Sequence, residues 1–158
     1  MLQLHREPDR NFVLREDGRE LGRLIYPKWW SARAEILLPE GIYDVRSKKW
    51  HSATVVAELH GVPIIEARFP WNGSIEVDRV AGQPGKLKVK YRSIWKAQHV
   101  VIDEEGNERM HLRSRMSWKM DRDHEIEKMG DPPLIPLEIL MIAHALNVRH
   151  RRAAGHAG

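Results

Sequence analysis

The residues from Leu134 to Val148 are apolar around almost the whole circumference of the helix that they would form. Within this segment only Glu138, His144 and Asn147 carry polar side chains. Pro136 suits the first turn of a helix, and Glu138 in the same turn complements the helix dipole. A helix without a polar face is stable only when it is enclosed, so this segment requires either a bilayer or a protein shell around it.

The length of the segment favours a protein shell. A helix that crosses a bilayer needs about 20 apolar residues, and this segment is shorter. About fifteen helical residues span about 22 Å, and strands of six to seven residues rise by about 20–23 Å. A barrel of such strands would enclose the helix along its full length, and we favour this arrangement over a C-terminal membrane anchor.

The chain from Phe12 to Met129 has the pattern of short antiparallel strands. Runs of alternating apolar and polar residues are separated by turn residues, at positions 16–18, 39–41, 60–61, 81–85 and 103–107. From Arg109 to Met120 the apolar residues share one parity, which predicts one long strand or two strands with a bend near Ser114. No strand–helix–strand alternation is present, so a parallel doubly wound sheet is not expected.

These features predict an all-β fold with one central helix, a closed antiparallel barrel of about twelve strands that encloses a C-terminal apolar α-helix. The chain has 158 residues, of which 42% are hydrophobic, and this suits a single domain with one core. The expected boundaries are an N-terminal extension at 1–10, the barrel domain at 11–149 with its helix at 134–148, and a disordered basic tail at 150–158.

This layout resembles the Tubby C-terminal-like superfamily, which includes LURP-one-related proteins and phospholipid scramblases. The resemblance rests on the first hairpin, Phe12–Ile25, on its echo at Val100–Glu108, and on the proline-rich entry and apolar helix at Pro132–Val148. It implies a twelve-stranded barrel around the helix and a role in binding phosphoinositides or acting at membranes. The chain has no cysteine to palmitoylate and no calcium loop of EF-hand spacing, so lipid scrambling is not expected.

The composition and motifs argue against several kinds of chemistry. The absence of cysteine removes disulfides, thiolate nucleophiles and cysteine-based metal sites, and it fits a reducing compartment. The nine histidines show no paired metal-binding spacing, so we expect no metal and no cofactor. No nucleophile elbow or phosphate-binding loop is present, and we expect a protein that is not an enzyme. A triad assembled from distant strands would leave no such signature.

The strongest candidate site in the sequence is a pair of basic strand faces. Lys86, Lys88, Lys90 and Arg92 alternate with apolar residues, which places four cations on one face of a strand. Arg109, Arg113, Arg115 and Lys119 form a second such column by the same alternation. We expect an anionic ligand to contact six of these residues: Lys86, Lys88, Lys90, Arg92, Arg113 and Arg115.

Two alternatives apply to these surfaces. Outward lysines and arginines are ordinary on a barrel exterior, and carboxylates on neighbouring strands, such as Glu76 or Asp78, would cancel their field. The adjacent Trp29 and Trp30 form a candidate interaction loop, although a tryptophan at this point could equally plug one end of the barrel.

The sequence therefore predicts a non-enzymatic binding module for anionic lipid head groups or for an acidic partner. The alternative is a structural or accessory subunit of a protein assembly that docks through Trp29, Trp30 and the basic tail. The net charge of +4 is small and no reading motif is present, so nucleic acid is not the expected partner. We expect a cytoplasmic protein, with peripheral binding at the membrane, and no transmembrane segment.

Overall fold

Most of this chain forms short strands in which buried residues alternate with more exposed ones. The computed structural model describes residues 1–28, 33–49, 53–82, 85–93 and 98–155. The twelve strands are β1 (Leu2–Arg6), β2 (Phe12–Glu16), β3 (Arg19–Ile25), β4 (Ala34–Leu38), β5 (Gly41–Ser47), β6 (Val55–Leu59), β7 (Val62–Arg68), β8 (Ile75–Arg79), β9 (Gly85–Ser93), β10 (Gln98–Asp103), β11 (Glu108–Ser114) and β12 (Asp123–Lys128).

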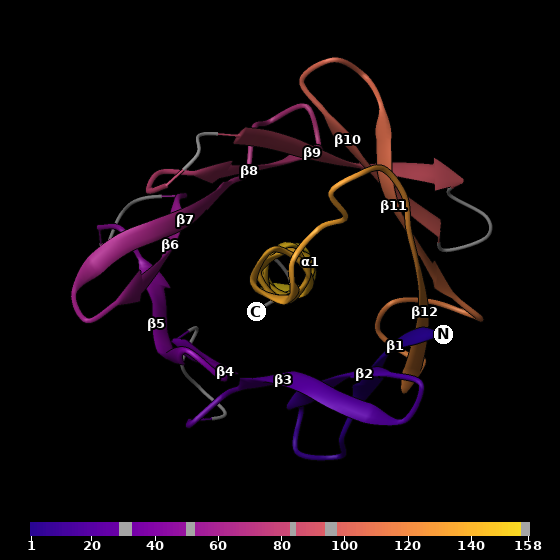
Figure 1. The fold of residues 1–158 in the computed structure, drawn as a ribbon, viewed down its shortest axis with the longest axis horizontal. Coiled ribbons are helices and arrows are strands. Elements are labelled where there is room, and N and C mark those ends of the chain that lie inside the picture. The colour runs from indigo at the N-terminus through magenta and orange to yellow at the C-terminus, as the bar shows by residue number, and fades with distance from the viewer. Residues whose placement is uncertain (29–32, 50–52, 83–84, 94–97, 156–158) are drawn as a thin grey trace.

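Each strand pairs antiparallel with its neighbours in sequence, and β1 also pairs with β12 to close the ring (Figure 1). At the closing seam Leu2 lies opposite Ile126 and Leu4 lies opposite His124. The prediction of a closed antiparallel barrel of about twelve strands is confirmed.

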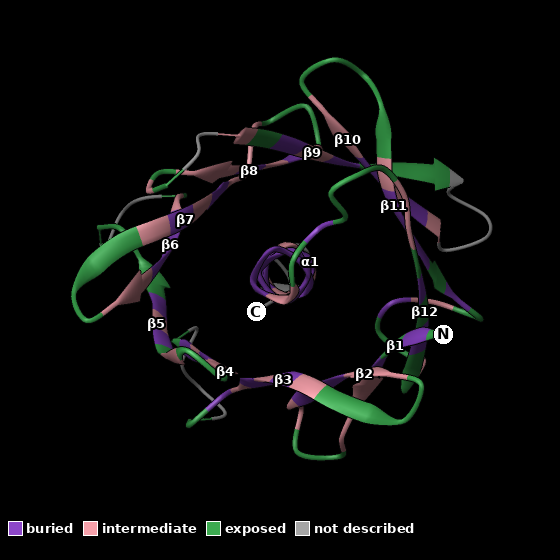
Figure 2. Cartoon of the chain, in the orientation of Figure 1, coloured by how far each residue is buried: buried purple, intermediate pink, exposed green. Residues whose placement is uncertain are grey.

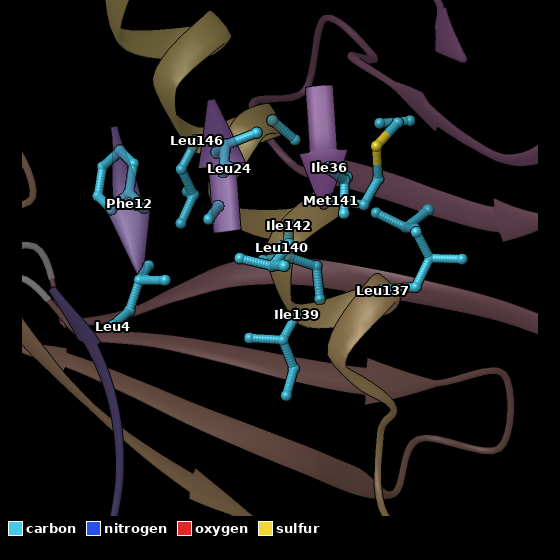
Figure 3. Packing of buried hydrophobic residues seen from close by; sticks show 14 of the residues in the cluster. Leu4, Phe12, Leu24, Ile36, Leu137, Ile139, Leu140, Met141, Ile142 and Leu146 are labelled. Carbon is cyan, nitrogen blue, oxygen red and sulfur yellow. The ribbon is translucent and has the colours of Figure 1, made fainter. Parts of the chain in front are cut away.

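The one helix of the described residues, α1 (Pro136–Gly155), runs through the centre of the barrel (Figure 1). Most of it is buried (Figure 2), and Leu140, Met141 and Leu146 have no exposed surface. Leu4, Phe12, Leu24 and Ile36 of the barrel wall belong to the same apolar cluster as the helix side chains (Figure 3). Since burial of one such side chain is worth about 1.5–3 kcal/mol, α1 is an integral part of the core.

The helix lies close to β3 at Gly22. A Cβ atom at this position would lie 3.1 Å from Cδ1 of Leu140, 3.0 Å from the carbonyl oxygen of Leu37 and 2.5 Å from Cδ2 of Leu38. A glycine is therefore needed where the helix, β3 and β4 meet.

The expected domain boundaries differ from the structure at both ends. Residues 1–10 are not an extension, because Leu2 and Leu4 point into the core and Leu2–Arg6 is a strand of the ring. The helix continues through the segment expected to begin the disordered tail. Its arginines lie over aromatic rings of the barrel, with Arg149 4.5 Å from the centre of the Tyr91 ring and Arg152 4.6 Å from that of Phe69.

The long strand expected at Arg109–Met120 is shorter in the structure. β11 ends at Ser114, and the chain then leaves the barrel wall in turns. Met116 and Met120 are therefore exposed, whereas Trp118 folds back and is buried. In the described part of the chain, no helix combines the length and the hydropathy that a membrane crossing would need.

Candidate anion-binding pocket at the C-terminal mouth

Three loops gather around the last turns of α1 at one end of the barrel. Trp118 of the β11–β12 loop donates to Asn147 at 2.8 Å, and Arg149 donates to the carbonyl oxygen of Gly73 in the β7–β8 loop at 3.0 Å. Arg10 of the β1–β2 loop lies over the ring of Tyr26. We call this end, made of the described residues 7–11, 69–74, 115–122 and 147–152, the C-terminal mouth.

The C-terminal mouth contains a pocket of about 290 Å³ whose charged lining is entirely basic. Its aromatic lining comes from Phe12, Tyr26 and Trp118, and Asn147 adds an amide. Among the described residues, no aspartate or glutamate lines it. The basic lining residues are Arg6, Arg10, Lys119, His150 and Arg151.

A chain of hydrogen bonds fixes the floor of this pocket. The indole nitrogen of Trp118 donates to Oδ1 of Asn147, and Nδ2 of Asn147 donates to the hydroxyl of Tyr26, each at 2.8 Å. The same hydroxyl lies 2.8 Å from Nδ1 of His144, within hydrogen-bonding distance.

Burial keeps this floor uncharged at neutral pH. It lowers the pKa of His144 from 6.5 to about 3, and the positive charge of Arg151 acts in the same direction. Burial also raises the pKa of Tyr26 to about 12. Neither group changes its protonation state near pH 7, so the floor acts as a fixed, neutral support.

Burial disfavours the charge of the basic side chains in the pocket, and repulsion by neighbouring cations adds to this effect. Burial is the first cause that lowers the pKa of Arg6, Arg122 adds to it, and the carboxylate of Asp121 acts in the opposite direction. The pKa of His150 is also lowered, by burial first and then by Arg149, Lys119 and Arg6. A bound anion would relieve this repulsion.

The acidic residues of the mouth are engaged elsewhere. Glu7 pairs with Arg23 at 3.1 Å, and Asp9 accepts hydrogen bonds from Asn11. Asp121 accepts from the backbone amides of residues 116 and 117 at 2.5 and 3.2 Å. These carboxylates stabilise the loops and do not line the pocket.

The lysines predicted on β9 do lie on the outer face of the barrel. Lys86 and Lys90 are exposed, and Lys88 is half-buried. In the register, however, Lys86 is directly opposite Asp78 and Lys88 is opposite Glu76. Both carboxylates also contact Arg68, at 2.7 and 3.1 Å. The column therefore shares its surface with acidic groups, as the alternative interpretation anticipated.

The structure does not gather the six predicted contact residues into one site. Nη1 of Arg92 contacts the ring of His111, which contacts Glu108 at 2.7 Å. Arg113 lies 3.6 Å from Glu127 on the barrel wall. Arg115 follows the end of β11 and belongs to the C-terminal mouth. Of the second column, Lys119 is the residue that lines the pocket.

The tryptophan residues lie in different environments. Trp29 and Trp30 lie outside the described residues. Trp118 covers the core at the C-terminal mouth, where it stacks on His124 at 4.3 Å and on Phe12 at 5.7 Å between ring centres. Trp71 is completely exposed.

Sequence reasoning missed four of the five basic pocket residues. Arg6 and Arg10 fell in the supposed extension, and His150 and Arg151 fell in the supposed tail. His150 and Arg151 belong to a basic run at the C-terminal end, whereas the two arginines in residues 1–10 are balanced by Glu7 and Asp9 and gave no signal. Within the described residues, no cluster of three or more histidine, aspartate or glutamate side chains is placed to hold a metal ion.

No protein-family model, curated protein or solved structure matches this chain. The resemblance to the Tubby C-terminal-like superfamily stays a prediction from the sequence.

Proposed function

We propose that this chain is a non-enzymatic binding module that takes a phosphate-bearing anion in the pocket of the C-terminal mouth. The observation that carries the proposal is a lining with five basic side chains and, among the described residues, no acidic one. Guanidinium groups bind phosphate oxygens through paired, charge-assisted hydrogen bonds, so three arginines on one pocket suit this chemistry.

The aromatic wall and the neutral floor support binding without catalysis. Tyr26 and Trp118 offer apolar surface beside the cations, which suits a phosphate ester that carries an organic group. The pKa values of Tyr26 and His144 lie far from 7, so neither group is poised to transfer a proton near neutral pH. The phosphate can come from a lipid head group or from a free phosphate ester, and a cytoplasmic protein bound at the membrane periphery fits the first source.

Calorimetry with inositol hexakisphosphate tests the pocket. Lys119→Glu reverses an exposed charge of the pocket, and Lys90→Glu makes the same change on the outer face of β9. We expect Lys119→Glu to weaken binding roughly tenfold or more, because a charge-assisted hydrogen bond is worth about 1.5–3 kcal/mol. Lys90→Glu should bind like the wild type.

The opposite pattern would move the site to β9. If Lys90→Glu abolishes binding and Lys119→Glu does not, the pocket is not the anion site. If the wild type binds neither inositol hexakisphosphate nor vesicles with phosphoinositide at low salt, the proposal fails.

A second candidate is an accessory subunit of a protein assembly, which the complete exposure of Trp71 favours. A single stoichiometric partner that is retained at high salt by the wild type and lost by Trp71→Ala would support it over anion binding.

A further inference from the structure

We infer that the C-terminal mouth binds flat on an anionic lipid bilayer, with Trp71 inserted among the head groups. This inference rests on the proposed function, since it names the lipid surface as the source of the phosphate that the pocket takes.

Trp71 is presented by a turn that is held in place. The amide of Gly73 donates to the carbonyl oxygen of Pro70 at 3.2 Å, and Asn72 accepts hydrogen bonds from the amide and the hydroxyl of Ser74. Gly73 has φ +86°, which suits glycine. Arg149 of α1 ties the turn to the core. A fully exposed tryptophan on a fixed turn offers a partner a large apolar surface with one polar N–H.

Two methionines project from another loop of the same end. Met116 and Met120 are 65% and 66% exposed, on either side of the buried Trp118. Asp121 holds the amide of Met116, and the hydroxyl of Ser117 holds the amide of Met120 at 3.0 Å. Both loops are attached to neighbouring residues of α1, so their apolar tips belong to one end of the molecule.

The two ends of the barrel differ in charge. The C-terminal mouth has an excess of positive charge, because its described carboxylates, Glu7, Asp9 and Asp121, are outnumbered by its arginines and lysines: Arg10, Arg115, Lys119, Arg122, Arg149, Arg151 and Arg152. The turns at the opposite end carry acidic residues, among them Asp17, Glu40, Glu104, Glu105 and Asp131. A negatively charged surface would therefore attract the mouth and repel the other end.

The pattern of exposed apolar side chains favours a lipid surface over a protein partner. Protein interfaces are built around a contiguous, tightly packed apolar centre. Here Trp71 and the two methionines are separate side chains on different loops, with cations around them. Single aromatic and aliphatic side chains among basic residues suit the head-group region of a bilayer.

Because the chain has no cysteine, a single introduced thiol can report the orientation. Trp71→Cys and Glu104→Cys place an environment-sensitive dye at the mouth and at the opposite end, both at exposed positions. Vesicles of phosphatidylcholine, with and without phosphatidylserine, are the probes. We expect a blue shift and shielding from iodide at position 71 with the anionic vesicles alone, reversed by high salt, and no change at position 104.

Substitutions of Trp71 test its insertion into the bilayer without a dye. Trp71→Ala should weaken partition into anionic vesicles roughly tenfold, because a large apolar side chain is lost from the interface. Trp71→Phe should restore part of the loss, and neither change should alter the binding of inositol hexakisphosphate.

The outcomes separate the two proposals. An equal response at positions 71 and 104, or a response at 104 alone, overturns the orientation. Normal vesicle binding by Trp71→Ala overturns the insertion. If the wild type binds inositol hexakisphosphate and ignores the vesicles, the lipid inference fails and the pocket stands. If it binds neither, both fail.

Discussion

Arg79 joins the barrel wall to the start of the central helix through Glu138. Nε and Nη2 of Arg79 lie 2.9 and 2.8 Å from Oε2 of Glu138, and Oε1 accepts the amide of Ile135 at 3.0 Å. The Glu138 side chain is 1% exposed. One buried carboxylate thus caps the helix and fixes it to β8, a role beyond the interaction with the helix dipole that its position in the first turn predicted.

Arg79→Leu should lower the free energy of unfolding by about 3–5 kcal/mol, because it leaves a buried carboxylate without its partner. Glu20→Gln breaks the exposed ion pair with Arg23 and serves as the control, with an expected loss of at most about 1 kcal/mol. Urea denaturation measures both. Equal effects of the two changes would contradict a special role for the buried pair.

Gly22→Ala should destabilise the protein by about 1–3 kcal/mol, because its methyl group would press on Leu38, Leu140 and a backbone carbonyl. Gly85→Ala is the matched change in a strand where no atom lies within 4 Å of the added Cβ. Thermal unfolding of the two variants should show a drop for the first and little change for the second. An unaffected Gly22→Ala variant would mean that the contact between helix and β3 relaxes easily.

Acid should destabilise the fold through its buried histidines. Burial lowers the pKa of His144 and His99 to about 3 and that of His124 to about 4, from 6.5. Below pH 6.5 the unfolded chain therefore binds more protons than the folded one. The contribution of these histidines to the free energy of unfolding is fully present above pH 6.5. It is lost as the pH falls towards 4, by about 1.4 kcal/mol per pH unit for each histidine.

Urea titrations between pH 7 and 4 measure this slope. His144→Asn should reduce it by the share of one histidine, whatever its effect at pH 7. The exposed His60 lies in a turn with φ 52°, which asparagine tolerates, so His60→Asn is the control and should keep the slope. A slope unchanged by His144→Asn would show that this histidine is not the titrating group.

The β9 column can be separated from the pocket by charge reversal. Replacing Lys86, Lys88 and Lys90 with glutamate leaves the inward residues Leu87 and Val89 untouched, so the barrel should still form, as circular dichroism would check. We expect vesicle binding to weaken less than with Lys119→Glu and Arg151→Glu together. A complete loss in the β9 variant alone would support the site first predicted from the sequence.

Local patterns in the sequence predicted most of the fold. The alternation of apolar and polar residues locates strands, and the wholly apolar helix requires an enclosure of matching length. β1 was missed because Leu2 and Leu4 are the only apolar residues on its inward face, and two residues are too few to reveal a period. The predicted end of the helix at Val148 was too early, because Arg149 and Arg152 have the sequence character of a solvated tail. The rings of Tyr91 and Phe69, which lie beneath these arginines in the structure, cannot be inferred from the sequence.

The pocket was beyond sequence reasoning for a geometric reason. Arg6, Arg10, Lys119 and Arg151 come from both ends and a late loop of the chain, and only the closure of the ring and the path of α1 bring them together. A basic column such as that on β9 is visible in sequence, whereas the register that places Asp78 and Glu76 opposite it is not.

The pairing of β1 with β12 also limits the order in which the molecule can assemble. The seam joins residues 2–5 to residues 123–126, and α1 follows β12 along the chain yet lies inside the ring. If the ring closed first, the helix would have to be threaded through a finished wall. We therefore expect the sheet to wrap around the helix, with the pairing of β1 and β12 forming late because it joins residues far apart in the sequence. Such a late, long-range closure makes folding slow compared with that of proteins of similar size built from local contacts.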